Sequence, residues 1–242
     1  MGNHVFLITG PEGVGKTTLL KLIKNTYRKR SKRTLCIEIY IRSTTLPVRL
    51  IKKLLVASGR RDLSYTQFLK KRVVDADSII INKISTLLLL LDFVFITLKV
   101  FLIFALHILK IPTLKVVILC ERFLPDTIID LFYFHFSYKS NKRILRLLTD
   151  FYFRYFMKIP TNIIFLDADI KTLTLRQKSR GRDEFLDFVL FQKHFLPKVL
   201  KYTGNFYYID STHYTIAESF TKIIEVLGLQ NALYYSSSFR SA

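Results

Sequence analysis

Short apolar runs alternate along the chain with longer segments of helical periodicity. Five runs rich in Val, Ile, Leu and Phe have the length and composition of buried strands. They are His4–Thr9, Thr34–Ile41, Thr113–Cys120, Thr161–Asp167 and Asn205–Asp210. Helical patterns lie between them, the first two at Lys16–Lys29 and Leu46–Ser58. Because parallel strands need crossover helices of one hand, this order predicts an α/β fold, a doubly wound five-stranded parallel sheet with helices on both faces.

One apolar segment, Leu87–Ile111, is long enough to allow a membrane span. Asp92, Lys99 and Lys110 interrupt it on nearly one line at about 100° per residue, with His107 about 60° away. We expect a mostly buried core helix packed against the sheet, with this polar line facing solvent or the acceptor cleft. A helix resting on a membrane or a partner is an alternative. A span is disfavoured because it would interrupt the sheet between its second and third strands.

A glycine-rich turn joins the first strand to the first helix. Residues 10–17 read GPEGVGKT and match G-x-x-x-x-G-K-[ST] between a strand and a helix, as this phosphate-binding motif requires. Its backbone N–H groups can bind phosphate oxygens, Lys16 can reach the β- and γ-phosphates, and the Thr17 hydroxyl can bind Mg²⁺. The residues expected around the phosphates are Gly10, Pro11, Glu12, Gly13, Val14, Gly15, Lys16, Thr17 and Thr18. The motif predicts a nucleoside triphosphate, with ATP and Mg²⁺ as the cofactors.

The other motifs narrow the class of nucleotide-binding protein. A GTPase would need N-K-x-D after a later strand, but Asn82–Ser85 lacks the Asp and lies in a predicted helix. No strand ends in the Asp-Glu pair of transport or helicase ATPases. After the third strand come Glu121, which can hold Mg²⁺ through water or accept a proton, and Arg122, which can grip a phosphate. An ordinary ion pair at the strand end is the structural alternative.

A second basic cluster lies in the segment RQKSRGRDEF, residues 176–185. Its cations are Arg176, Lys178, Arg180 and Arg182, grouped around one glycine. Such a loop can close over phosphates and stabilise the charge that develops during transfer. The alternative is a solvated basic helix end.

Composition adds limits on partners and compartment. The formal net charge of +20 implies anionic partners, which could be nucleotides, nucleic acid or an acidic membrane surface. Cys36 and Cys120 lie in apolar runs and suggest core residues in a reducing compartment. The start lacks the basic region of a signal peptide, so a cytoplasmic protein is expected, with peripheral membrane attachment as the alternative. One domain is expected over residues 1–228, followed by a flexible tail at 229–242.

The order of these parts resembles that of thymidylate kinases and, more distantly, of deoxynucleoside kinases, over roughly Val5–Leu227. GPEGVGKTT resembles their phosphate loop, and VVILCERF their strand ending in Asp-Arg-Tyr/Phe, with Glu121 in place of Asp. IIFLDADIKTLTLRQKSRGRDEF is similar to their strand, short helix and arginine-bearing lid. YYIDSTHYTIAESFTKII resembles their last strand and helix. The resemblance implies a P-loop kinase with an Arg-rich lid at about residues 176–185.

It also implies roles for individual residues. Glu12, Arg42 and Arg122 would contact the acceptor, and Glu121 would lie near Mg²⁺ with Thr17. Because position 14 is Val and the lid is Arg-rich, the resemblance is to the type with catalytic lid arginines. Lys16, Glu121, Arg122, Arg180 and Arg182 would then be the catalytic set.

The sequence departs from thymidylate kinases in the motifs that bind the phosphate acceptor. IRSTTLP keeps only Arg42 of their acceptor turn, and Phe93 follows Asp92 where they often carry Arg. Phosphoryl transfer from ATP to a nucleoside monophosphate, with dTMP as first candidate, is the expected activity. A deoxynucleoside kinase or a kinase of another small alcohol stays open, as does a non-catalytic ATP-binding protein on a membrane surface. A homodimer is left open, and nucleic acid is not favoured as a partner.

Overall fold

The computed structural model describes residues 4–30, 34–40, 79–108, 115–137, 142–155, 162–179, 186–203 and 206–226. Its strands form a five-stranded, all-parallel sheet in the order β2-β3-β1-β4-β5. They are β1 (His4–Thr9), β2 (Thr34–Tyr40), β3 (Lys115–Glu121), β4 (Asn162–Asp167) and β5 (Phe206–Asp210). The predicted α/β fold and all five predicted strands are confirmed. The strand boundaries differ by at most two residues from the expected ones, with Glu121 becoming the last residue of β3.

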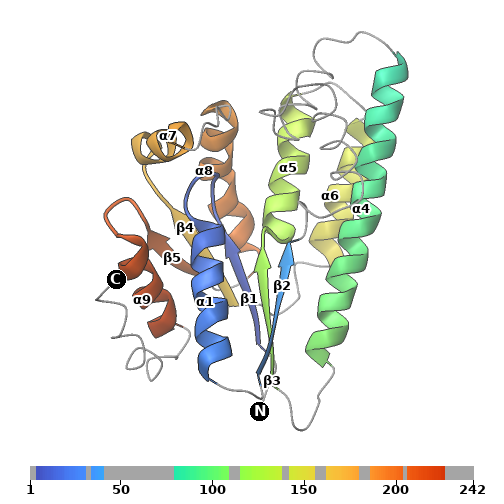
Figure 1. Cartoon of the computed structure of the whole chain (residues 1–242). Helices are drawn as coiled ribbons and strands as arrows, with labels where there is room; N and C mark the ends of the chain where they lie inside the picture. The colour runs from blue at the N-terminus through green and yellow to red at the C-terminus, as the bar shows by residue number, and fades with distance from the viewer. Residues whose placement is uncertain are drawn as a thin grey trace, which may run out of the picture.

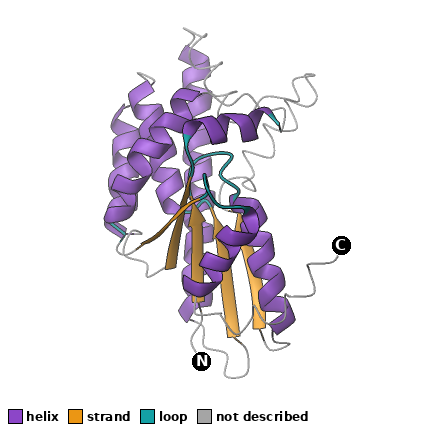
Figure 2. Ribbon diagram, turned by 90° about the vertical axis from the view of Figure 1, so that its left-hand side faces the viewer, coloured by secondary structure: helices purple, strands orange, loops and turns teal. Residues whose placement is uncertain are grey.

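Helices cover both faces of the sheet (Figures 1 and 2). They are α1 (Lys16–Arg30), α4 (Ile79–Ile108), α5 (Leu124–Ser137), α6 (Lys142–Tyr155), α7 (Ile170–Lys178), α8 (Leu186–Lys201) and α9 (Ile216–Val226). The side chains of β1 alternate between two cores, as expected for a strand covered on both sides. Val5 and Leu7 belong to the core with α4, α5, α6 and α8. Phe6 and Ile8 belong to the core with α1, α7 and α9.

The register of the central strands brings the chemistry to one edge. Ile8 of β1 lies opposite Glu121 of β3, so the phosphate loop leaves the sheet beside the end of β3. The described loops gather at the carboxyl ends of the strands (Figure 2), which is where ligands bind in open α/β sheets. Cys36 and Cys120 are both free and buried, as expected, and burial raises the pKa of the Cys120 thiol to about 12.

Helix α4 begins eight residues before the predicted start at Leu87 and packs against the sheet as expected. Ile96, Val100 and Ile103 on its inner face are at most 2% exposed. The expectation that the helix is mostly buried is wrong for the opposite face, which is apolar and open. Of the predicted polar line, Lys99 is partly exposed. The structure does not describe the side chains of Asp92 and His107, and Lys110 lies outside the described residues. Within that part, no helix combines the length and hydropathy needed to cross a membrane.

Several expectations fall on residues outside the described part of the chain. These are the helix at Leu46–Ser58, the acceptor residue Arg42, the lid arginines Arg180 and Arg182, and the tail at 229–242.

Candidate functional site at the phosphate loop

The phosphate loop passes close to the backbone of β4, and Gly10 makes this approach feasible. Its φ is +149°, a conformation that side-chain-bearing residues rarely adopt. A β-carbon at this position would lie 2.1 Å from the carbonyl oxygen of Leu166. The loop can therefore leave β1, run against β4 and turn into α1, whose first residue is Lys16.

Lys16 lies inside the loop that it terminates. Its side chain is buried, and its Nζ donates to the carbonyl oxygens of Gly10 at 2.6 Å and Pro11 at 2.7 Å. The ammonium group thus sits at the concave side of the loop, where the predicted phosphates would lie. The side chain is held by backbone carbonyls, which anionic phosphate oxygens could replace as partners.

Thr17 and Glu121 meet in front of the loop. The Thr17 hydroxyl donates to Glu121 Oε1 at 2.8 Å, while Glu121 Oε2 is buried without a hydrogen-bond partner in the described structure. Burial raises the pKa of the Glu121 carboxyl, against the opposing effects of the Lys16 charge and the Thr17 hydrogen bond. A hydroxyl and a carboxylate with an unused oxygen suit Mg²⁺, which prefers oxygen ligands and otherwise keeps waters and phosphates. The pair predicted for the metal is therefore brought together.

Arg122 forms an ion pair with Glu12 across the mouth of the loop. Its backbone has a φ of +56°, which is uncommon for a residue other than glycine and costs roughly 1–3 kcal/mol. Such conformations concentrate at functional sites, where the surrounding structure holds them in place. The structure thus places two of the three predicted acceptor residues side by side.

Asp126 is a site residue that sequence reasoning missed. It lies in the first turn of α5, is buried, and accepts a hydrogen bond of 2.7 Å from the hydroxyl of Thr9 at the end of β1. Burial raises the pKa of its carboxyl, although Lys16, the Thr9 hydrogen bond and Arg122 act in the opposite direction. The sequence feature that could have indicated Asp126 is its position, five residues after Glu121.

The Asp126→Asn variant should gain stability relative to the native chain as the pH rises, which means that the difference in their free energies of unfolding grows with pH. A raised carboxyl pKa means that the folded state binds the proton more tightly, so native stability falls as pH rises from the ordinary value of 3.8 through the raised value. The amide removes this charge but can still accept from Thr9. Urea unfolding across a pH series measures the difference in the free energy of unfolding between the variant and the native chain. Asp150→Asn, which changes an exposed carboxyl on α6, is the control. A difference that does not grow with pH would contradict the expectation.

Two glutamines also hold the loop and were not predicted. Gln192 of α8 accepts a 3.1 Å hydrogen bond from the backbone N–H of Glu12. Gln177 of α7 donates to the Glu12 carbonyl oxygen at 3.5 Å. Both side chains are buried, so α7 and α8 clamp the loop residue that pairs with Arg122.

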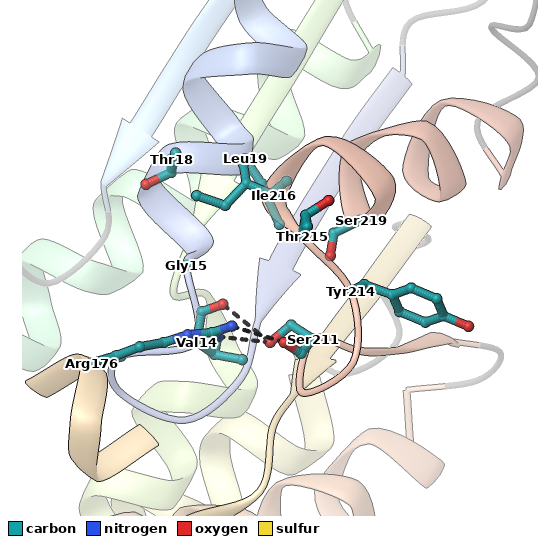
Figure 3. Close-up of a pocket in the computed structure, with 11 residues that line it drawn as sticks. Val14, Gly15, Thr18, Leu19, Arg176, Ser211, Tyr214, Thr215, Ile216 and Ser219 are labelled. Carbon is teal, nitrogen blue, oxygen red and sulfur yellow. Dashed lines mark hydrogen bonds between the residues drawn. The ribbon is translucent and has the colours of Figure 1, made fainter. Parts of the chain in front are cut away.

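A pocket of about 240 Å³ opens beside the loop, between α1, α7 and α9 (Figure 3). Its lining comprises Gly13, Val14, Gly15, Thr18, Leu19, Arg176, Ser211, Tyr214, Thr215, Ile216 and Ser219. Thr215 and Glu218 form a capping box that begins α9 at the pocket, with the Glu218 carboxylate accepting from the Thr215 N–H at 2.7 Å. The Ser219 hydroxyl is buried without a hydrogen-bond partner in the described structure. The pocket therefore offers an apolar wall with a few polar groups next to the phosphate site.

Arg176 belongs to this pocket. Its guanidinium donates to the Ser211 carbonyl oxygen at 2.8 Å and to the Ser211 hydroxyl at 3.1 Å (Figure 3). The sequence grouped Arg176 with the lid cations, but the structure holds it at the loop before α9. Lys178 is exposed on α7.

Comparisons with known proteins agree with this architecture. A family model described as an AAA domain matches residues 1–92, less than half of the chain. No curated protein matches the sequence.

Solved structures match over nearly the whole chain. The thymidylate kinase of Candida albicans has a TM-score of 0.63 at 16% identity, covering 96% of this chain and 93% of its own. The deoxyadenosine kinase of M. mycoides has a TM-score of 0.55 at 14% identity, covering 93% and 98%. The thymidylate kinase of Ehrlichia chaffeensis has a TM-score of 0.50 at 17% identity, covering 94% and 100%. The chain therefore has the α/β fold of the P-loop kinases, and the resemblance seen in its motifs is confirmed at the level of the fold.

Proposed function

We propose that this protein transfers the γ-phosphoryl group of ATP to a nucleoside monophosphate, with dTMP as the first candidate. The observation that carries the proposal is the convergence of Lys16, the Thr17–Glu121 pair and the Glu12–Arg122 pair at one edge of a P-loop kinase sheet. Phosphoryl transfer depends mainly on positioning and on neutralising charge, and these residues supply both.

The donor half of the site follows from the loop and the pocket beside it. Lys16 and the backbone N–H groups of the loop would bind the β- and γ-phosphates. The base would enter the pocket, with the apolar wall on one side and the Arg176–Ser211 pair on the other. Thr17 and Glu121 would hold Mg²⁺, which when bound neutralises the developing charge on the phosphates.

The acceptor half rests on Arg122. A monophosphate entering the mouth of the loop would compete with Glu12 for the guanidinium, and a dianionic phosphate is the stronger partner. Glu12 would then be released towards the acceptor sugar, the role implied by the family resemblance. Arg42 for the acceptor, and Arg180 and Arg182 for charge stabilisation from the lid, remain part of the proposal on that resemblance.

A nucleoside is the second candidate acceptor, and one observation favours it. Glu121 combines a raised pKa with an unpartnered oxygen, which would make its carboxylate a better base than an ordinary one. A neutral 5′-hydroxyl must lose its proton during attack, whereas a phosphate oxygen needs little help. The two candidates therefore assign different importance to Arg122.

Arg122→Ala should raise the KM for a monophosphate acceptor by about 10–100-fold, because a charge-assisted hydrogen bond to the phosphate is lost. The KM for ATP should change little, since Arg122 lies outside the donor pocket. Steady-state kinetics with dTMP and with thymidine measure the KM for each acceptor and for ATP. Arg28→Ala on α1 serves as the control. Unchanged dTMP kinetics would remove Arg122 from the acceptor site.

A further inference from the structure

Among the side chains of helix α4 that the structure describes, both faces are apolar, but only the inner face is covered. Six large side chains on the outer face are between 40% and 67% exposed. They are Leu91, Val94, Leu98, Phe101, Leu102 and Ile108. A helix that is hydrophobic all round is normally buried on every side. The outer face of α4 therefore has the composition of a contact surface.

Helix α6 extends this surface. Leu147, Phe151 and Tyr155 are 61%, 36% and 65% exposed, and the Phe151 ring contacts Phe93 of α4 with centroids 5.5 Å apart. We call these nine exposed side chains the α4–α6 apolar face. At about half exposure each, they leave on the order of 900 Å² of apolar surface open, against roughly 300–600 Å² for the largest patch of a typical monomer.

Exposed arginines border the α4–α6 apolar face. Arg143, Arg146 and Arg154 lie on α6 within an arc of roughly 80°, next to the Leu147 and Phe151 side, at about 100° per residue. Asp150 is the exposed acid in the same arc of α6. The border therefore carries an excess of positive charge, on a chain whose formal net charge is +20.

We propose that the α4–α6 apolar face docks this protein on an anionic lipid bilayer. Its apolar side chains would enter the boundary between headgroups and acyl chains, and Arg143, Arg146 and Arg154 would contact lipid phosphates. A second copy of this chain is the poorer occupant, because it would bring the same arginines and another +20 charge to the contact. An anionic bilayer supplies the opposite charge and an apolar interior at once.

Docking in this way leaves the nucleotide site open. The pocket beside the phosphate loop lies between α1, α7 and α9, which cover the opposite face of the sheet from α4 and α6. In Figure 1, α4 and α6 lie on the right of the molecule, and α1, α7 and α9 lie to their left. The inference is thus independent of which acceptor the site uses.

Vesicle flotation of the full chain tests the proposal. The native protein should float with vesicles containing about one third phosphatidylserine and stay at the bottom with phosphatidylcholine alone. The triple variant Arg143→Ser, Arg146→Ser, Arg154→Ser should lower the partition coefficient roughly 100-fold, at about fivefold per arginine. The double variant Leu98→Ser, Phe101→Ser should lower it at least about tenfold through lost apolar burial. Both variants alter exposed side chains, and circular dichroism checks that they fold.

The control is a triple variant on the other side of the sheet, Lys21→Ser, Arg28→Ser, Lys29→Ser on α1, which should bind within a few-fold of the native chain. Failure of the native protein to float with anionic vesicles would overturn the proposal. So would a loss of binding in the α1 variant as large as that in the α6 variant. A solution dimer in light scattering that Leu98→Ser, Phe101→Ser dissociates would also overturn it, and would assign the face to self-association instead.

Discussion

Lys16→Ala is expected to lower the rate of phosphoryl transfer by about 10²–10³-fold. The Lys16 ammonium lies in the concavity of the loop, bound to the carbonyl oxygens of Gly10 and Pro11, where it can neutralise charge on the transferred group. A close cation in a site that excludes water contributes far more than an exposed one, and alanine offers no replacement.

The fold should survive this change, because the Lys16 side chain faces the loop concavity and takes no part in either apolar core. Initial rates with saturating ATP measure the effect, and circular dichroism with thermal melting checks the fold. Lys21→Ala, an exposed lysine on the same helix, should retain the native rate. A Lys16→Ala protein that transfers phosphate at the native rate would show that the loop does not serve the reaction.

Gly10→Ala is expected to lower the free energy of unfolding by roughly 3 kcal/mol or more. The added β-carbon would lie 2.1 Å from the Leu166 carbonyl oxygen and 3.2 Å from a methyl group of Val14. Leu166 belongs to β4, which pairs with β1 and β5, so its carbonyl cannot move without disturbing the sheet. The φ of +149° adds backbone strain to the steric overlap.

Gly15→Ala separates the two causes within the same loop. Gly15 also has a positive φ, of +100°, but no atom lies within 4 Å of the position that an added β-carbon would take. Only backbone strain remains, at roughly 1–2 kcal/mol. Urea unfolding of both variants and the native chain gives the comparison. Equal losses for the two variants would mean that the close approach to Leu166 is not what requires glycine at position 10.

Local signals were sufficient for the parts of the fold and site that are continuous in sequence. The five strands are compact apolar runs, and the phosphate loop is one uninterrupted motif whose partners, Lys16 and Thr17, lie within it. Glu121 could be placed because it follows a strand that must end at the same edge as the loop. Each of these predictions needed only a pattern and the geometry of a parallel sheet.

Residues that act through distant partners could not be predicted in this way. Asp126 meets Thr9 from 117 positions along the chain, and Gln192 meets Glu12 from 180 positions. Asp and Gln side chains are common on helices, and only the packing of α5 and α8 places these two beside the phosphate loop. Arg176 was grouped with its sequence neighbours, whereas its partner Ser211 lies 35 residues away.

Helix α4 shows the limit of periodicity. Its hydropathy pattern predicted an apolar helix that contacts the core, and the structure contains that helix and that contact. Periodicity reports which side chains are apolar but not which of them find a neighbour. Whether Leu98 and Phe101 would be covered depended on the arrangement of the other helices, and in the structure they are open.

Transfer of label from [γ-³²P]ATP to a panel of nucleosides and nucleoside monophosphates tests the central claim most directly. With Mg²⁺ present, the native protein should label a monophosphate, dTMP first among those tested, and Lys16→Ala should show about 10²–10³-fold less product. Label on thymidine but not on dTMP would move the assignment to the nucleoside acceptor that Glu121 favours. ATP binding without label on any member of the panel would contradict the account, and would leave a nucleotide-binding protein that does not transfer phosphate to nucleosides or nucleotides.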